Sequence, residues 1–473
     1  MDPRYAALAK VLADHGQSHL LTFYDDLDPD GRARLLDQIE SINWDQIDRL
    51  IESHVHHKPA FELPEDLQPA PYYPIEPDDQ LRAKYQQATE EGERLVRDGK
   101  VACFVVAGGS GTRLGWDGPK GTFPATPVEA KPLFQVFAEG IRANEIKYGA
   151  AIPWLVMTSP ANDQQTRAFF EQHDHFGLNA DQVVFFAQGT MPAIAYDGRV
   201  LLADKDELAL SADGHGGSLK AIHRSGALQT LKQRGIERLS YFQVDNPTVK
   251  VVDPLFIGLH ALDHAQMSSK MVAKAYGKEK LGNFCLIDGK MTIVEYSDLP
   301  DDLAEERDAQ GELRFRAGSP AIHVIDVEFI DRLNRGGELQ LPYHRAEKKV
   351  PHLDTETAEH VDPQSPNAVK LEQFVFDALP LCDTSIILQT TREEEMAFIK
   401  NAEGESSPRS SRQLQSDRAC RWLAQAGVDV PGPDEDGHFD CVVELSPLTA
   451  VAPEDLNHAA PLKKIEPGDK LSL

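Results

Sequence analysis

The sequence predicts an α/β protein whose central sheet is largely parallel. From about residue 99 onward, apolar segments of strand length alternate with segments in which apolar residues recur at helical spacing. This alternation is typical of β-α-β units, in which helices cover both faces of a parallel sheet. A glycine-rich run follows the first predicted strand, and such sheets bind ligands at the carboxyl ends of their strands. The expected strands are 101–106, 154–158, 183–186 and 239–244, and the expected helices are 133–141, 164–173 and 219–234.

The chain of 473 residues exceeds what one hydrophobic core usually supports, so we expect more than one domain. Residues 1–98 are predicted to form a helical N-terminal region, which includes a proline-rich connector from 59 to 77 and a helix over 78–97. Residues 99–384 are expected to form the main α/β domain, with a hairpin turn at 287–290. Residues 385–473 mix charge, serine and proline and are expected to form a small C-terminal domain.

The composition of the chain limits its partners. A formal net charge of −28 argues against nucleic acid or an anionic membrane surface as a partner. The five cysteines include no CxxC pair, which predicts free thiols in a reducing cytoplasm. No apolar run approaches the roughly 20 residues that a membrane span requires. We therefore expect a cytoplasmic protein with no membrane partner, and the sequence predicts no particular oligomeric state.

The most informative segment is the glycine-rich run from Ala107 to Gly115, which continues into the tripeptide Pro-Lys-Gly at 119–121. Glycines at a strand end let the backbone approach a ligand without an intervening Cβ atom. Successive backbone N–H groups in such a loop can hold phosphate oxygens. Arg113 and Lys120 add two positive charges in the same segment. The run therefore predicts a site that binds a nucleoside triphosphate and carries out chemistry at its phosphates.

Two common phosphate-binding patterns fit this run poorly. A Walker loop requires GxxxxGK[ST], but Lys120 is preceded by proline and followed by glycine. A dinucleotide fingerprint requires G-x-G-x-x-G, whereas the spacing here is one residue longer. That fingerprint also needs an acidic residue at the end of the second strand, and Glu139, at the right distance, lies in a predicted helix. A dehydrogenase is therefore the weaker interpretation.

A third pattern, G-x-G-T-R followed by P-K, fits the run, and further segments extend the match. These segments are 154–159, 185–193 (FFAQGTMPA), 213–217 (DGHGG), 244–246, 294–297 (VEYS), 348–354 (KKVPHLD) and 370–377 (KLEQFVFD). Through them, from about residue 100 to 400, the chain resembles the eukaryotic UDP-N-acetylhexosamine pyrophosphorylases and the wider family of UTP-dependent sugar-1-phosphate uridylyltransferases. The resemblance implies a Rossmann-like (GT-A-like) nucleotidyltransferase domain with smaller flanking N- and C-terminal domains. It also implies that UTP and a hexose-1-phosphate react, with Mg²⁺, to give a UDP-sugar and pyrophosphate.

The resemblance implies a role for each part of the glycine-rich run. Backbone donors of the run would bind the phosphates and ribose of UTP, and a strand-to-helix turn without a ligand is the alternative. Arg113 would bind the β- and γ-phosphates through its planar fork of donors. Lys120 would reach the α-phosphate and stabilise the transition state, whereas a surface lysine is by default only solvated. The residues expected to bind the nucleotide are Ala107, Gly108, Gly109, Gly111 and Thr112.

The other expected nucleotide ligands come from separate segments. Asp245 follows the strand 239–244, where a carboxylate beside phosphates suits Mg²⁺, and a turn-capping aspartate is the alternative. Gln188 and Gly214 match the family positions that read uracil, and an amide can bond both a carbonyl and an N–H of the base. Lys349 and Lys370 match lysines near the phosphates, with Lys370 expected to take part in catalysis. Without the resemblance, Gln188 and the two lysines would be interpreted as solvated polar residues on the surface.

The sugar is the least specified part of the predicted site. Glu295 matches the family glutamate that holds sugar hydroxyls. His215 and Ser319 depart from the family, because the N-acetylhexosamine enzymes carry asparagine at both positions, and the sequence GHG occurs in related UDP-glucose pyrophosphorylases. The acceptor can therefore be N-acetylglucosamine-1-phosphate, glucose-1-phosphate or galactose-1-phosphate. A regulator that binds nucleotide sugars without catalysis is the alternative from another class, against which the joint presence of Arg113, Lys120, Asp245 and Lys370 argues.

Overall fold

The chain forms two units from interleaved segments, in a computed structural model that describes residues 3–59, 63–64, 66–336, 339, 341–456 and 462–473. The first unit comprises Met1–Glu62, Gly189–Gly217 and Leu341–Val375, and the second comprises Leu63–Gln188, Ser218–Gln340 and Phe376–Leu473. These boundaries differ from the three consecutive segments expected at 1–98, 99–384 and 385–473. The physical reason is that the hydrophobic cluster of each unit draws on segments far apart in the sequence.

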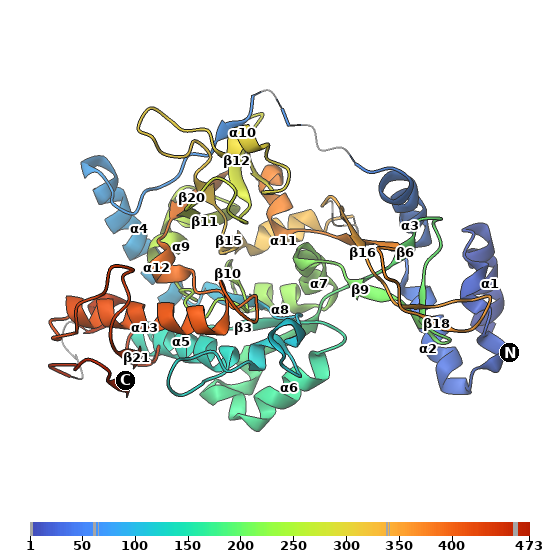
Figure 1. Ribbon diagram of the computed structural model, residues 1–473, viewed down its shortest axis with the longest axis horizontal. Coiled ribbons are helices and arrows are strands. Elements are labelled where there is room, and N and C mark those ends of the chain that lie inside the picture. The colour runs from blue at the N-terminus through green and yellow to red at the C-terminus, as the bar shows by residue number, and fades with distance from the viewer. Residues whose placement is uncertain (1–2, 60–62, 65, 337–338, 340, 457–461) are drawn as a thin grey trace. The chain divides into compact units, whose positions relative to one another are not determined.

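The central sheet of the second unit has the parallel core that the sequence predicts (Figure 1). β10 pairs in parallel with β2, β2 with β3, and β3 with β4. β2 and β3 carry almost only apolar residues and are buried nearly throughout, as expected for strands covered on both faces. The bounds are Val101–Val106 for β2, Trp154–Thr158 for β3, Val183–Ala187 for β4 and Arg238–Gln243 for β10.

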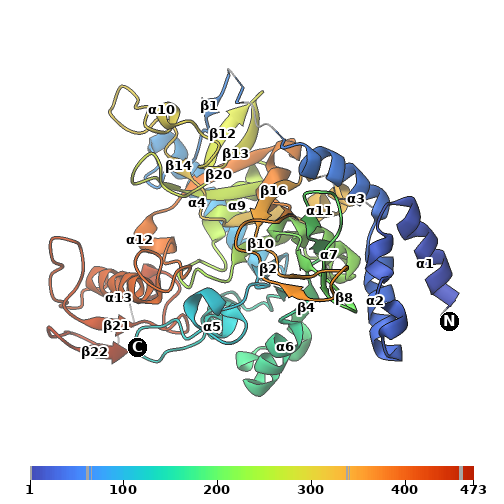
Figure 2. The same ribbon diagram turned by 45° about the vertical axis from the view of Figure 1, so that its right-hand side comes forward.

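Beyond β10 the sheet continues with mostly antiparallel pairing, so the sheet as a whole is mixed. β15 pairs antiparallel with both β10 and β11, and β20 pairs parallel with β11. The predicted hairpin is confirmed as β12 and β13, and its turn residues Asp288 and Gly289 have positive φ. Figure 2 shows these two strands with β1 and β14 at one edge of the sheet. The bounds are Gln68–Pro69 for β1, Met267–Ala273 for β11, Asn283–Ile287 for β12, Lys290–Val294 for β13, Ala317–Gly318 for β14, His323–Asp326 for β15 and Ser385–Gln389 for β20.

The predicted helices are confirmed, with one correction. The segment 219–234, expected as one helix, forms two, because Gly226 adopts a φ of +78° between them. That backbone conformation interrupts a right-handed helix and is accessible to glycine without strain. The helices of the second unit up to residue 340 are α4 Asp79–Arg97, α5 Leu133–Tyr148, α6 Asp163–Gln172, α7 Ser218–Arg224, α8 Ala227–Gln233, α9 Pro254–Leu262, α10 Asp301–Ala304 and α11 Val327–Leu333.

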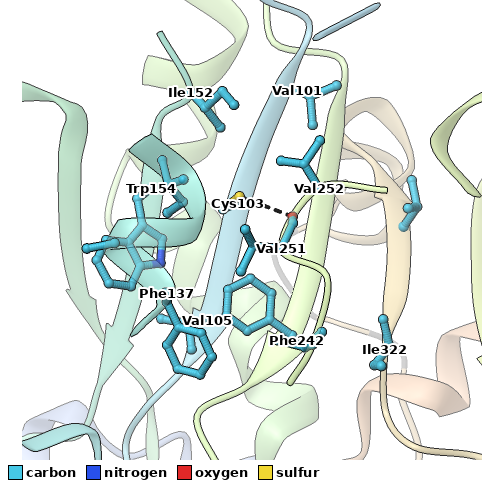
Figure 3. Packing of buried hydrophobic residues seen from close by; sticks show 14 of the residues in the cluster. Val101, Cys103, Val105, Phe137, Ile152, Trp154, Phe242, Val251, Val252 and Ile322 are labelled. Atoms are coloured by element: carbon cyan, nitrogen blue, oxygen red, sulfur yellow. Dashed lines mark hydrogen bonds between the residues drawn. The ribbon is translucent and has the colours of Figure 1, made fainter. Parts of the chain in front are cut away.

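One face of the sheet packs on α4, α5, α6 and α9 through a single large hydrophobic cluster. Alternate residues of β2, namely Val101, Cys103 and Val105, belong to this cluster, which is the period-two pattern of a strand. Figure 3 shows them beside Phe137 and Phe242, with the Cys103 thiol donating to the Val251 carbonyl oxygen at 3.3 Å. Because the core fixes β2 and β10, it also fixes where the loops that follow them begin.

In the first unit, the N-terminal helices pack against strands from two later segments. Leu12, Leu35 and Ile39 share a buried cluster with Ile194 and Leu371, which lie in those segments. The N-terminal region therefore completes its core with residues that the sequence places in the middle of the chain. The helices are α1 Pro3–Asp14, α2 Pro29–Ser41 and α3 Trp44–Leu50, and the strands are β5 Thr190–Pro192, β6 Ile194–Ala195, β7 Leu202–Asp204, β8 Glu207–Leu208, β9 Leu210–Ala212, β16 His344–Lys348, β17 His352–Leu353, β18 His360–Val361 and β19 Ala368–Glu372.

The C-terminal residues have a small hydrophobic cluster of their own, around Trp422, Leu423 and Val443. They are nevertheless part of the second unit, because β20 adds a strand to its central sheet. Among the helices of the described residues, none combines the length and hydropathy of a membrane span. The elements after β20 are α12 Arg392–Glu395, α13 Pro408–Gln425, β21 Val442–Glu444 and β22 Lys470–Ser472.

Helices α4 and α9 approach each other through glycines. A Cβ atom at Gly258 would lie 1.6 Å from the Ala88 carbonyl oxygen, and one at Gly92 would lie 1.9 Å from the Pro254 carbonyl oxygen. Since both obstacles are backbone atoms, the two helices can pack this closely only without side chains at these positions.

We predict that Gly258→Ala destabilises the protein by about 1–3 kcal/mol, because the added methyl group forces α4 and α9 apart. Gly432→Ala is the matched control, since a Cβ atom there meets nothing within 4 Å. Chemical unfolding of both variants and of the unchanged protein measures the difference. Equal stability of the two variants would contradict the packing argument.

Candidate functional site

The glycine-rich run forms a compact loop at the carboxyl end of β2. The loop folds back on itself, since Gly111 N–H donates to the Gly118 carbonyl oxygen at 2.9 Å and Lys120 N–H donates to the Gly109 carbonyl oxygen at 3.1 Å. The backbone N–H groups of Gly108 and Gly109 donate to no acceptor in the part of the chain that the structure describes. The loop therefore offers donors of the kind that hold phosphate oxygens.

Asn162 holds this loop from the side of β3. Its Nδ2 donates to the carbonyl oxygens of Ala107 at 3.0 Å and of Gly109 at 3.3 Å, and its Oδ1 accepts from Ser159 N–H at 2.8 Å. Asn162 is almost fully buried. Asn162 is not among the residues predicted from the sequence, although a polar residue shortly after a strand that neighbours the glycine-rich loop is a signal that could have found it.

Gln188 lies against the same loop. It follows β4, and its N–H donates to the Thr158 carbonyl oxygen at 2.9 Å, which extends the parallel pairing beyond the strand ends. A Cβ atom at Gly108 would lie 2.8 Å from Gln188 Nε2, so the absence of a side chain at Gly108 leaves room for the amide. The structure thus places Gln188 beside the loop, as the shared edge of β2, β3 and β4 predicts.

Lys120 and Asp245 form an ion pair beside the loop. Lys120 begins a short 3-10 helix, Lys120–Thr122, and its Nζ lies 3.4 Å from Asp245 Oδ2. Both side chains are largely buried, at 15% and 10% exposed. Asp245 Oδ1 is buried and has no hydrogen-bond partner among the described residues. Burial and the nearby charge of Asp245 also raise the pKa of the Tyr241 hydroxyl.

The half-satisfied carboxylate of Asp245 is the feature that fits a metal ion. A buried acceptor without a partner is uncommon, and each one calls for an explanation such as a ligand. No group of three or more acidic, histidine or cysteine side chains that could hold a metal lies within the described ranges. Magnesium, however, commonly uses one or two carboxylates together with substrate phosphates. The residues present therefore fit Mg²⁺ held jointly with a nucleotide.

Other predicted residues lie in the same unit. Arg113 is exposed on the short 3-10 helix Thr112–Leu114 of the loop. Glu295 directly follows β13, and its Oε1 would lie 3.5 Å from a Cβ atom at Gly282. Ser319 N–H donates to the Gly282 carbonyl oxygen at 2.9 Å. Two of the three residues expected to meet the sugar, Glu295 and Ser319, therefore lie close to Gly282, a residue that the sequence did not single out.

The remaining predicted residues belong to the first unit. Gly214 has a φ of +85°, and a Cβ atom there would lie 2.4 Å from the Gln373 carbonyl oxygen, so a side chain is excluded. Lys370 lies on β19, opposite Ala346 of β16, and Lys349 is exposed just after β16.

His215 is held tightly by its surroundings in the first unit. Its Nδ1 accepts a hydrogen bond from Val375 N–H at 3.1 Å, so Nδ1 carries no proton in this arrangement. Its ring stacks on Phe374 at a centroid distance of 5.2 Å, and Phe374 in turn stacks on His344 at 4.2 Å. These contacts fix the His215 ring within the first unit.

A sheet with a parallel core, a glycine-rich loop at its edge and an adjoining lysine–aspartate pair are together typical of nucleotide-binding α/β proteins. A family profile described as UTP–glucose-1-phosphate uridylyltransferase matches residues 39–403, which is more than half of the chain. The chain belongs to this family of nucleotidyltransferases, which confirms the resemblance seen in the sequence.

Similar proteins share nearly the whole length of the chain. It is 35% identical over 475 residues to UDP-N-acetylhexosamine pyrophosphorylase-like protein 1 of Xenopus tropicalis, covering 94% of this chain and 91% of that protein. It is 32% identical over 465 residues to UDP-N-acetylglucosamine pyrophosphorylase of Saccharomyces cerevisiae, covering 95% and 96% respectively. The structure of uridine diphosphate N-acetylglucosamine pyrophosphorylase from Trypanosoma brucei, solved with an inhibitor, matches with a TM-score of 0.80 at 26% identity and covers 98% of each chain.

We predict that Asn162→Ala weakens UTP binding about tenfold, because the carbonyl oxygens of Ala107 and Gly109 lose their side-chain donor and the loop loosens. A hydrogen bond of this kind is typically worth about 0.5–1.5 kcal/mol, and 1.4 kcal/mol corresponds to a factor of ten. Calorimetric titration with UTP measures the affinity, and thermal unfolding measures stability alongside it. A variant with lower stability and unchanged UTP affinity would show that Asn162 supports only the fold.

Proposed function

We propose that this protein transfers the uridylyl group of UTP to a hexose-1-phosphate and releases pyrophosphate. The acceptor is N-acetylglucosamine-1-phosphate or glucose-1-phosphate. The family description names UTP and glucose-1-phosphate, and the names of the Xenopus and yeast relatives specify N-acetylated sugars. The observation that carries the proposal is the Lys120–Asp245 pair beside a glycine-rich loop with available backbone donors.

The reaction brings together two anions, so alignment and charge compensation are its main demands. An oxygen of the sugar phosphate attacks the α-phosphorus of UTP, and the bond to the leaving pyrophosphate breaks. Backbone N–H groups of Gly108 and Gly109 hold the triphosphate, and Arg113 binds its outer phosphates. Lys120 exchanges its partner Asp245 for the α-phosphate, which frees Asp245 as a metal ligand. No covalent intermediate with a protein side chain is needed.

Mg²⁺ is the metal that we propose for this site. When bound, the ion supplies positive charge to the phosphates. Asp245, whose Oδ1 has no partner among the described residues, would hold the ion, and Lys120 would pair with the substrate phosphates. Lys349 and Lys370 of the first unit are proposed to add charge near the phosphates, and Gln188 and Gly214 to read the uracil ring.

The sugar is proposed to meet Glu295, Ser319 and His215. An asparagine donates and accepts a hydrogen bond at its side-chain end, and serine is shorter while histidine is bulkier. We therefore propose a weaker preference for the N-acetyl group than in enzymes that carry asparagine at both positions.

We also propose a cytoplasmic location. The five cysteines support it, because all are buried and none forms a disulfide. A regulator that binds nucleotide sugars without catalysis is the alternative from another class.

A pyrophosphate-release assay tests the proposal directly. UTP is offered with N-acetylglucosamine-1-phosphate, glucose-1-phosphate and galactose-1-phosphate, and other nucleoside triphosphates serve as controls. Turnover with UTP and one of these sugars supports an enzyme. Tight binding of UDP-sugars without pyrophosphate release from any pair would instead support the regulator.

We predict that Lys120→Ala lowers kcat by about 10²–10³, the typical value of one charge that acts in the transition state. UTP binding should weaken much less, because backbone donors of the loop remain. Turnover and calorimetry on the same variant separate the two effects. Lys147→Ala is the control, since Lys147 pairs with Asp455 on the surface. Unchanged kcat with a large loss of UTP affinity would refute the role of Lys120.

We predict that the double change His215→Asn with Ser319→Asn shifts the ratio of kcat/KM toward N-acetylglucosamine-1-phosphate. Two amides would then be available to an N-acetyl group, and a polar site discriminates against a ligand that leaves its groups unpaired. The ratio for the two sugars is measured in the unchanged protein and in the double variant. If the unchanged protein already selects the N-acetylated sugar strongly and the double change leaves the ratio alone, other residues choose the sugar.

A further inference from the structure

Asp245 receives almost no support through its own side chain. Its only hydrogen bond or ion pair to another described side chain is the 3.4 Å contact with Lys120, and its Oδ1 has no partner there. Its backbone is held instead, because Ile399 N–H donates to the Asp245 carbonyl oxygen at 2.8 Å. The direction of the carboxylate therefore depends on the segment around residue 399, which lies more than 150 positions further along the sequence.

Asn246, the next residue, connects the loop after β10 to the segment 395–397, because both ends of its amide form hydrogen bonds. Its Nδ2 donates to the Glu395 carbonyl oxygen at 2.7 Å. Its Oδ1 accepts from Thr248 Oγ1 at 2.9 Å and from Ala397 N–H at 3.2 Å. Ala397 N–H is shared with Thr248 Oγ1, also at 3.2 Å. Asn246 and Thr248 are each only 2% exposed, so these bonds do not compete with solvent.

Asn246 bonds to the segment 395–397, and a buried triad of charged residues, Lys270, Asp253 and Glu395, holds that segment in place. Lys270, 1% exposed, lies 2.5 Å from Glu395 Oε2 and 2.6 Å from Asp253 Oδ2. Glu395 also accepts from Thr390 Oγ1 at 2.8 Å and from Lys250 N–H at 3.0 Å. Every charge of the triad thus has a close partner, which is the condition under which buried charges persist.

The two acids keep the triad charged. Burial alone would lower the pKa of Lys270, but the charges of Asp253 and Glu395 outweigh it and raise that pKa. Burial would likewise raise the pKa of Asp253, but the charge of Lys270 holds the pKa of Asp253 below its usual range. Arg418 of α13 also connects the two segments, since its Nη1 donates to the carbonyl oxygens of Thr248 at 2.8 Å and Glu394 at 3.0 Å.

We propose that Asn246 and Thr248 are positioning residues that aim the Asp245 carboxylate at the metal and the triphosphate. This inference rests on the metal role given to Asp245 under the proposed function. Both residues act through hydrogen bonds to the segment 395–397, which the buried triad keeps in place. Groups that orient a metal-binding side chain in this way typically change metal affinity or activity by about 10–100-fold when they are removed.

The experiment compares four changes with Asp245→Asn as the reference. Asn246→Ala removes the amide, and Thr248→Val removes the hydroxyl while keeping the shape of the side chain. Thr248→Ser keeps the hydroxyl and should restore normal behaviour. Asn334→Ala is the matched control, because Asn334 is also buried and its Nδ2 donates to the carbonyl oxygens of Leu219 at 2.9 Å and Ile330 at 2.8 Å.

Three measurements are made on each full-length protein. The Mg²⁺ concentration for half-maximal turnover is determined at saturating UTP and sugar phosphate. Binding of Mn²⁺ in the presence of UTP is followed by electron paramagnetic resonance, which needs no turnover. Thermal unfolding reports on the fold. We expect Asn246→Ala and Thr248→Val to weaken Mn²⁺ binding and to raise the Mg²⁺ requirement about 10–100-fold. Thr248→Ser and Asn334→Ala should leave both unchanged.

The outcomes separate this inference from the proposed function. If Asp245→Asn loses metal binding while Asn246→Ala and Thr248→Val keep it, the positioning role is refuted and the proposed function stands. If Asp245→Asn binds Mn²⁺ as the unchanged protein does, the metal role of Asp245 fails, and the inference falls with it. A loss in Asn334→Ala equal to that in Thr248→Val would show general destabilisation and also refute the inference. If Asn246→Ala does not fold, the Thr248→Val and Thr248→Ser pair decides.

Discussion

The parallel pairing of β10 with β2 is the constraint on which the candidate site depends. In this register Gln243 lies opposite Val106, and Val244 N–H still donates to the Val106 carbonyl oxygen at 3.2 Å. The two strands therefore end together, and the loops that follow leave from the same edge of the sheet. Lys120 and Asp245 are 125 residues apart in the sequence, yet in this register their charged atoms lie 3.4 Å apart. A shift of the register would separate the lysine from the carboxylate without changing either residue.

Close-range charge explains how so acidic a protein can bind anions. The formal net charge of −28 would repel nucleotides if all charges acted equally, but salt screens charges beyond roughly 8–10 Å. The charges of Lys120 and Arg113 lie in the same loop of the second unit as the available backbone donors. The charge of Lys120 is balanced by Asp245, so the site avoids an uncompensated buried cation. Under the proposed function, a phosphate of the substrate takes the place of Asp245 as the partner of Lys120.

The sequence predicted the parts of the protein that local pattern determines. The four parallel strands, the hairpin turn and the placement of Gln188 and Asp245 after strand ends all follow from hydrophobic periodicity and turn chemistry. Gly226 broke one predicted helix, since a single glycine in an otherwise helical pattern does not reveal its φ. The two units could not be predicted, because Ile194 and Leu371 meet the N-terminal helices through contacts that leave no periodic mark in the sequence. For the same reason Gly282 was missed, whereas Asn162 carried a usable signal as a polar residue shortly after a strand of the sheet.

The C-terminal segment shows most clearly why sequence position is a poor guide to function here. Composition suggests a separate small domain after residue 385, and a hydrophobic cluster around Trp422 does form there. Yet Ile399 N–H holds the backbone of Asp245, and Arg418 holds the carbonyl oxygen of Thr248. A fold that presents a carboxylate at a strand end must resist the charge repulsion between that carboxylate and incoming phosphates. Fixing the backbone of Asp245 with a segment that Lys270 holds in place meets this demand and leaves Asp245 Oδ1 without a partner among the described residues. The last part of the chain therefore supports the backbone of the loop after β10, although nothing in its own sequence indicates this.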